Sequence, residues 1–229
     1  MSIVFIISAP SGSGKSTLVN QLLKTISGLN FSISYTTRPP RGNERSGVEY
    51  FFASKTEFEA MIERDDFLEH ACVFGNYYGT ARRFLREAQA SGHDLVLDID
   101  VQGAEQLKKR IPDAVSIFIL PPNREELEGR LRSRGLDAEP VIVRRLDTAR
   151  REIENYSKYD YILINDELDR SADDLRAIVL AERLRRAKAK SSAADAELIE
   201  RAQACRLEQA RDRVQPILAS FAPQTAGGR

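Results

Sequence analysis

The chain has 229 residues, and its 34 Lys and Arg are balanced by 34 Asp and Glu, so the formal net charge is zero. A neutral chain lacks the overall basic field of nucleic-acid binders and anionic-membrane binders, so no nucleic acid and no membrane is expected as a partner. With 42% hydrophobic and 30% charged residues, the composition is that of an ordinary globular enzyme.

The cysteines and the N-terminus indicate the compartment. Cys72 and Cys205 lie far apart and lack the spacing of metal ligands, so neither a disulfide framework nor a zinc site is expected. The N-terminus carries no basic leader or small-residue cleavage site, and its apolar run at 3–7 is too short to span a membrane. Together these features predict a cytoplasmic protein.

The chain opens with an apolar, β-branched run at 3–8, which is typical of a strand buried on both faces of a parallel sheet. Leucines at helical spacing predict a helix over 18–26, so the order is strand, glycine-rich loop, helix. Residues 31–52 mix Ser, Thr, Arg and Pro with alternating aromatics, which predicts short antiparallel strands and loops.

Two helices are predicted before the next buried strand. Ser54 and Glu57 have the spacing of a capping box and mark the start of the first helix. The second is predicted over 81–91 and ends near Gly92.

The rest of the chain up to about residue 184 alternates apolar runs with helical patterns. Strands are predicted at 95–99, 115–120 and 161–164, and helices at 102–110, 124–133 and 172–184. Asn123 and Glu126 have the spacing to cap the helix at 124–133. This alternation predicts an α/β fold with a parallel sheet covered on both sides by helices.

The tail from residue 185 onward differs in composition, being rich in Ala, Arg, Glu and Gln. Residues 195–213 are predicted to form a marginal, solvated helix, and residues 214–229 are predicted to be disordered. The tail at 185–229 is therefore expected to be helical or disordered, and its role is left open.

The strongest motif follows the first predicted strand and resembles the phosphate-binding loop of P-loop nucleotide-binding proteins. It fits the pattern at Gly14, Lys15 and Ser16, but Ala9 stands where the pattern has its first glycine. Backbone N–H groups of such a loop converge on phosphate oxygens, the lysine reaches the β/γ-phosphates, and the hydroxyl of Ser16 is offered to Mg²⁺. The predicted ATP-binding residues of the loop are Ala9, Pro10, Ser11, Gly12, Ser13, Gly14, Lys15, Ser16 and Thr17.

Two further patterns point to anion and metal chemistry. Arg38 and Arg41 lie three residues apart on a proline-stiffened loop, and arginine suits bidentate recognition of phosphate. Asp98 and Asp100 flank Ile99, so on one strand both would point to the same face, at the carboxyl end where open parallel sheets place their sites. Asp98 is predicted to organise Mg²⁺ through water, although a structural ion pair is the competing interpretation.

Six ordered segments closely resemble the guanylate kinase family. They are APSGSGKST at 9–17, YTTRPPRGNE at 35–44 with GVEY at 47–50, LEHACVFGNYYGT at 68–80, LDIDVQG at 97–103, RLRSRG at 130–135 and YILIND at 161–166. The resemblance extends from about residue 3 to 184 and leaves out the tail. It implies an enzyme that transfers the γ-phosphoryl group of ATP to GMP, and to dGMP as well, with Mg²⁺ accompanying ATP and no tightly bound cofactor.

The resemblance also implies a domain organisation. A P-loop core would comprise about 1–33, 81–125 and 150–184, with a small mixed β region for GMP at about 34–80 and a helical lid at about 126–149. The 1–184 domain would precede the 185–229 tail.

Particular residues acquire roles by the same resemblance. The implied ligands of the GMP phosphate are Arg38, Arg41, Tyr50 and Tyr78, and the implied neighbours of the guanine base are Ser34, Glu69, Thr80 and Asp100. Guanine presents two adjacent donors to a carboxylate such as Glu69, whereas adenine presents an acceptor and would be rejected.

The lid would supply positive charge to the transferring phosphoryl group. The resemblance implies that Arg134 and Arg145 reach it, and Arg130 and Arg144 are close competitors. Asn165 is implied to contact the adenine or ribose of ATP. Lys15, Arg38, Asp98, Arg134 and Arg145 are thus the predicted catalytic residues.

Three other classes of protein remain as alternatives. A non-catalytic interaction module of guanylate-kinase type would lose the residues for ATP chemistry, yet Lys15, Ser16 and Asp98 are present. A P-loop kinase of a sugar phosphate would have little use for Glu69. A basic nucleic-acid binder is disfavoured by the neutral charge. The residues leave open whether the chain forms a homo-oligomer.

Overall fold

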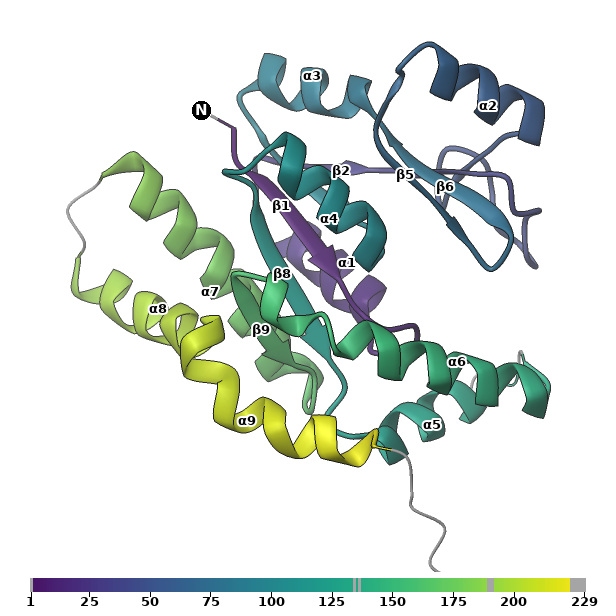
Figure 1. The fold of residues 1–229 in the computed structure, drawn as a ribbon. Coiled ribbons are helices and arrows are strands. Elements are labelled where there is room, and N and C mark those ends of the chain that lie inside the picture. Colours follow the sequence, from purple (N-terminus) through teal and green to yellow (C-terminus); the bar gives the residue numbers. More distant parts are fainter. Residues whose placement is uncertain (1, 134, 136, 189–191, 223–229) are drawn as a thin grey trace, which may run out of the picture. The chain divides into compact units, whose positions relative to one another are not determined.

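The computed structural model describes residues 2–133, 135, 137–188 and 192–222. The chain forms two compact units (Figure 1). The first unit comprises Met1–Ile7 and Ile26–Ser116, and the second comprises Ser8–Thr25 and Ile117–Arg229.

The first unit contains parallel strands in the order β2-β7-β1. They are β1 (Val4–Ser8), β2 (Leu29–Ser32) and β7 (Asp94–Asp98). Val4 pairs with Leu95, and Leu29 pairs with Asp94, so β7 is hydrogen-bonded on both sides. All of β1 is buried, as expected for a strand inside a parallel sheet, which confirms the interpretation of its continuous apolar run.

A second, mixed sheet in this unit has the order β4-β3-β6-β5. Its strands are β3 (Tyr35–Thr36), β4 (Phe51–Phe52), β5 (Phe67–Val73) and β6 (Asn76–Ala81). The prediction of short strands and loops over 31–52 is confirmed, and its antiparallel pairing holds between β3 and β6. It is wrong for β2, which pairs in parallel with β7, and for β3 with β4, which also pair in parallel.

The first unit carries the helices α2 (Lys55–Glu63), α3 (Arg82–Ser91) and α4 (Val101–Arg110). The capping box of Ser54 and Glu57 is confirmed, and α3 ends at Gly92 in the left-handed conformation with φ of 70°. The prediction that Asp98 and Asp100 share one face of a strand is wrong. β7 ends at Asp98, and Asp100 is the N-cap of α4, accepting a hydrogen bond from the N–H of Gly103 at 2.9 Å.

The second unit pairs β8 with β9 in parallel, with Ile117 opposite Tyr161. Its elements before the tail are α1 (Lys15–Thr25), β8 (Val115–Leu120), α5 (Arg124–Ser133), α6 (Glu139–Ile153), a 3₁₀ turn at Tyr156–Lys158, β9 (Tyr161–Ile164) and α7 (Leu168–Ala187). The predicted cap of α5 is confirmed, because the side-chain oxygen of Asn123 accepts from the N–H of Glu126 at 2.8 Å.

The tail forms two further helices, α8 (Ala193–Ala204) and α9 (Leu207–Ser220). The prediction of disorder is therefore wrong for residues 214–220, and residues 223–229 lie outside the described part. Val214, Ile217 and Phe221 are buried, so tertiary packing stabilises a helix that would be marginal in isolation. Within the described residues, no helix combines the length and the apolar character needed to cross a membrane.

Candidate active site

The phosphate loop connects the end of β1 to the start of α1 within the second unit. Gly12 and Gly14 have φ of 98° and 89°, a backbone region that side chains disfavour, so glycine is needed at both positions. The N–H of Ser13 donates to the carbonyl of Pro10 at 3.1 Å, which closes the loop. Lys15 is the first residue of α1, whose first turn carries no acidic side chain to oppose a bound anion.

The exposed hydroxyls of Ser16 and Thr17 lie in the same first turn of α1. Hydroxyl and carboxylate oxygens are donors that Mg²⁺ prefers, so the types of atom at Ser16 and at Asp98 fit this metal. Asp98 ends β7 in the first unit and is partly buried.

The loop packs closely against side chains of α5 and against Asn165. A Cβ atom added to Gly12 would lie 2.9 Å from side-chain carbons of Leu127 and Leu131, both fully buried on α5. A Cβ atom on Gly14 would collide with the side-chain amide nitrogen of Asn165. The loop therefore sits against α5 and the end of β9 with no room for a side chain.

Asn165 holds the loop directly. It is 4% exposed, and its Nδ2 donates to the carbonyl of Ser13 at 2.7 Å. The backbone carbonyl of Asn165 accepts a hydrogen bond from Nη2 of Arg130 at 2.9 Å. In the structure the amide thus positions the loop backbone, and a contact of Asn165 with adenine or ribose stays a prediction.

The arginine loop of the first unit is organised by an acid that sequence reasoning missed. Arg38 donates through Nη2 to both carboxylate oxygens of Glu44, at 3.0 and 2.9 Å, and the N–H of Arg41 donates to Glu44 at 2.8 Å. Burial opposes the charge on Arg38, but the Glu44 carboxylate outweighs it and raises the pKa of the guanidinium. The only sequence signal for Glu44 is an acid six residues after Arg38.

The predicted phosphate ligands gather around Arg38. Its guanidinium carbon lies 5.3 Å from the ring centre of Tyr50. The rings of Tyr50 and Tyr78 meet edge to face at 5.9 Å, which brings both phenols to the arginine loop. The side chain of Arg41 is exposed, and only its backbone is fixed by Glu44.

Glu69 is a buried acidic residue of the first unit. It lies on β5 opposite Thr80 of β6 and is only 3% exposed. Burial penalises its charge, and the nearby carboxylate of Asp100 adds repulsion, which together raise the pKa of Glu69 to about 7. A Cβ atom on Gly103 would collide with the Glu69 carboxylate, so the first turn of α4 faces this group directly.

The remaining predicted neighbours of the base lie around Glu69. Thr80 is fully buried, and Asp100 caps α4 through Gly103. Ser34 lies between β2 and β3, partly buried, and its carbonyl accepts from the N–H of Phe51 at 2.9 Å.

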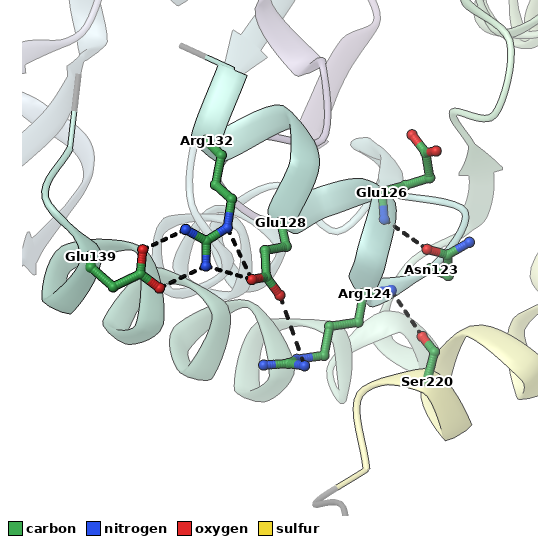
Figure 2. Close-up of polar contacts among 7 residues, drawn as sticks. All are labelled: Asn123, Arg124, Glu126, Glu128, Arg132, Glu139 and Ser220. Atoms are coloured by element: carbon green, nitrogen blue, oxygen red, sulfur yellow. Dashed lines mark hydrogen bonds and ion pairs between the residues drawn. The ribbon is translucent and has the colours of Figure 1, made fainter. Parts of the chain in front are cut away.

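Helices α5 and α6, where the lid is predicted, are joined by a charged cluster (Figure 2). Arg132 donates to Glu128 at 2.7 Å and to Glu139, the first residue of α6, at 2.6 Å. Sequence reasoning missed Arg132, because many charges in this stretch fit an ordinary solvated helix. Pro140 lies in the first turn of α6, where a proline removes no hydrogen bond of the helix.

Two arginines were expected to reach the transferring phosphoryl group. Arg145 pairs with Asp137 at 3.1 Å, and both side chains are largely buried. Arg134 lies outside the described residues. Arg130, a competitor, is engaged with Asn165 instead.

The chain is similar to known proteins over most of its length. A family model described as guanylate kinase matches residues 1–182. The chain is 58% identical over 225 residues to a guanylate kinase of Koribacter versatilis, covering 97% of each chain, and 51% identical over 189 residues to one of Escherichia coli K12, covering 82% of this chain and 91% of the relative. A crystal structure of guanylate kinase from Anaplasma phagocytophilum superposes with a TM-score of 0.66 at 35% identity, covering 79% of this chain and 86% of that one.

Proposed function

The chain belongs to the guanylate kinase family, and on this premise we propose that it transfers the γ-phosphoryl group of ATP to GMP, and also to dGMP. The observation that carries the acceptor assignment is the buried Glu69 carboxylate facing Gly103. The cytoplasm is the proposed compartment. The division into core, GMP region, lid and tail given above is proposed for this chain as well.

On the donor side, the backbone of the loop from Ala9 to Gly14 binds the phosphates of ATP, and Lys15 neutralises the β/γ-phosphates. Asn165 fixes the carbonyl of Ser13, so the loop is preorganised before the nucleotide arrives. Ser16, with Asp98 acting through water, would hold Mg²⁺, which would neutralise part of the charge on the phosphates of ATP.

On the acceptor side, Arg38, Arg41, Tyr50 and Tyr78 bind the GMP phosphate. Both terminal nitrogens of Arg38 are already engaged, Nη1 with the carbonyl of Pro39 at 2.8 Å and Nη2 with Glu44. The GMP phosphate therefore competes with Glu44 for Arg38, and Glu44 keeps the guanidinium in place until the substrate binds.

The base is read by Glu69, whose carboxylate accepts from the N1–H and the exocyclic amine of guanine. Adenine offers an acceptor at N1, which would leave the buried carboxylate unpaired. The site should therefore discriminate against AMP by roughly 10⁴-fold in kcat/KM. Ser34, Thr80 and Asp100 complete the surroundings of the base.

The acceptor oxygen belongs to a phosphate that is already anionic near neutral pH, so no general base is needed. The protein positions two anions and neutralises their repulsion, with Arg134 and Arg145 adding charge from the lid. Closure of the lid excludes water and so protects ATP from hydrolysis.

The test is a coupled assay of ADP formation from ATP and Mg²⁺, with GMP, dGMP, AMP, IMP and ribose 5-phosphate as acceptors. We expect turnover with GMP and dGMP only. Lys15→Met should lower kcat/KM by at least about 100-fold, because it removes charge stabilisation at the transferring group. Lys24→Met is the matched control, since Lys24 is exposed in the last turn of the same helix.

Two outcomes would contradict the proposal. Turnover with ribose 5-phosphate would favour the sugar-phosphate kinase, which has no use for Glu69. No turnover with any acceptor by a folded protein would favour the non-catalytic interaction module.

A further inference from the structure

The segment 205–222 is fixed at its start to the edge strand β9. The N–H of Ile162 donates to the carbonyl of Cys205 at 2.7 Å, and the N–H of Leu207 donates to the carbonyl of Asp160 at 3.2 Å. The tail backbone therefore pairs with β9 on both sides of Tyr161, as an added strand would.

A buried carboxylate strengthens this attachment. Glu182 of α7 is 1% exposed and accepts from the hydroxyl of Tyr161 at 2.6 Å and from Arg206 at 2.8 Å. The Arg206 guanidinium also lies 4.2 Å from the ring centre of Tyr161. A buried charge requires such partners, so Arg206 of the tail is bound firmly to the body of the unit.

The other end of the segment reaches the start of α5 (Figure 2). The side-chain oxygen of Ser220 accepts from the N–H of Arg124, the first residue of α5, at 3.0 Å across 96 positions of sequence. The first N–H groups of a helix have no acceptor within the helix. Asn123 satisfies the N–H of Glu126, and Ser220 satisfies that of Arg124.

α5 is the element that the phosphate loop and the lid share. Leu127 and Leu131 pack beneath Gly12, and Arg130 binds the Asn165 that holds Ser13. The displacement of α5 would therefore move the loop that is expected to bind ATP.

Charged side chains also run along α5 from its first residue to the start of α6 (Figure 2). Arg124 lies 4.0 Å from Glu128, which accepts from Arg132, which in turn binds Glu139. Single surface ion pairs contribute little to stability, but a connected series fixes the relative placement of the two helices.

We propose that Ser220 is a positioning residue for ATP: by capping α5 from the tail, it sets the place of the helix on which the phosphate loop and the lid depend. The proposal rests on the proposed kinase function, and it assigns the tail a role in the ATP half of the reaction. It predicts an effect on ATP that is absent for GMP.

The experiment compares Ser220→Ala with the wild type by steady-state kinetics and by calorimetric titration of ATP with Mg²⁺. We expect the KM and Kd for ATP to rise about fivefold, the size of effect typical of a lost helix cap, while the KM for GMP stays unchanged. Ser220→Thr should restore the wild-type values, since it retains the hydroxyl acceptor. Hydrogen exchange should show faster exchange at the Arg124 N–H in Ser220→Ala only.

Ser192→Ala is the matched control, because Ser192 caps α8 through Asp195, and among the described residues no hydrogen bond links it to α5. The proposal is overturned if Ser192→Ala weakens ATP binding equally, if GMP is affected as much as ATP, or if Ser220→Ala changes nothing. The calorimetric Kd does not require turnover. An inactive wild type that still shows the Ser220 effect would therefore contradict the kinase function while supporting the positioning role.

Discussion

The two proposed substrate regions of the molecule differ in the groups that they present to a ligand. The phosphate loop of the second unit presents backbone, shaped by Gly12 and Gly14 at positive φ. The acceptor region of the first unit presents side chains, including the buried Arg38 and Glu69. Phosphate is recognised by charge and needs only converging N–H groups, whereas a base edge requires donors and acceptors at fixed places.

Because of this difference, the two regions should respond to different perturbations. Backbone N–H groups do not titrate, so the phosphate loop depends on conformation and on close packing against α5 and Asn165. A buried carboxylate does titrate, so the acceptor region depends on electrostatics as well as on shape.

The largest effect is expected from a methyl group in the loop. Gly14→Ala places a side chain at φ of 89° and against the amide of Asn165, which both strains the backbone and displaces the group that holds Ser13. We expect kcat/KM for ATP to fall by at least about 100-fold. Gly92→Ala, at φ of 70° with nothing within 4 Å, is the control for backbone strain alone. Equal losses in both variants would show that packing of the loop is unimportant.

A methyl group at Gly103 tests the acceptor region by shape. Gly103→Ala should collide with the Glu69 carboxylate and raise the KM for GMP about 10- to 100-fold, leaving the KM for ATP unchanged. Alanine has a higher helix propensity than glycine, so the rise in the KM for GMP would not come from unfolding of α4. Gly129→Ala, in α5 with nothing within 4 Å, controls for a helical glycine elsewhere. An unchanged KM for GMP would separate Glu69 from base recognition.

The smallest effect is expected from pH. Guanine donates to the ionised carboxylate, so protonation of Glu69 below its pKa of about 7 weakens GMP binding, by about tenfold at pH 6 relative to pH 8. The stability of the free protein should change in the opposite direction. It falls as pH rises from 4.5, the usual value for this group, to about 7, because only the unfolded chain ionises freely in that window.

Calorimetric titration of GMP between pH 6 and 8 measures the first effect, and chemical unfolding over pH 4.5–7 measures the second. The phosphate of GMP titrates too, so the comparison with Glu69→Gln isolates the carboxyl. If Glu69→Gln retains the full pH dependence, the electrostatic account of the acceptor region is wrong.

The sequence alone predicted the regular part of this fold well. This prediction depended on signals between residues close in sequence. They are the apolar runs of the parallel strands, the capping box at Ser54 and Glu57, and Gly92 after α3. It also predicted the strand, glycine-rich loop and helix at the start of the chain, because their pattern is local in the sequence; ATP binding by this loop stays a prediction. The predicted roles of Arg134 and Asn165 in the reaction stay predictions.

The tertiary structure decided which side chains meet once the loops and helices have folded. Glu44 holds Arg38, Asn165 holds the phosphate loop, and Arg132 joins α5 to α6. The prediction was wrong for residues 214–220, where Pro216 disfavours a helix in an isolated segment. α9 is ordered because Val214, Ile217 and Phe221 are buried and because its ends bind β9 and α5. Such burial and long-range capping are properties of the packed chain, and no local pattern in the sequence encodes them.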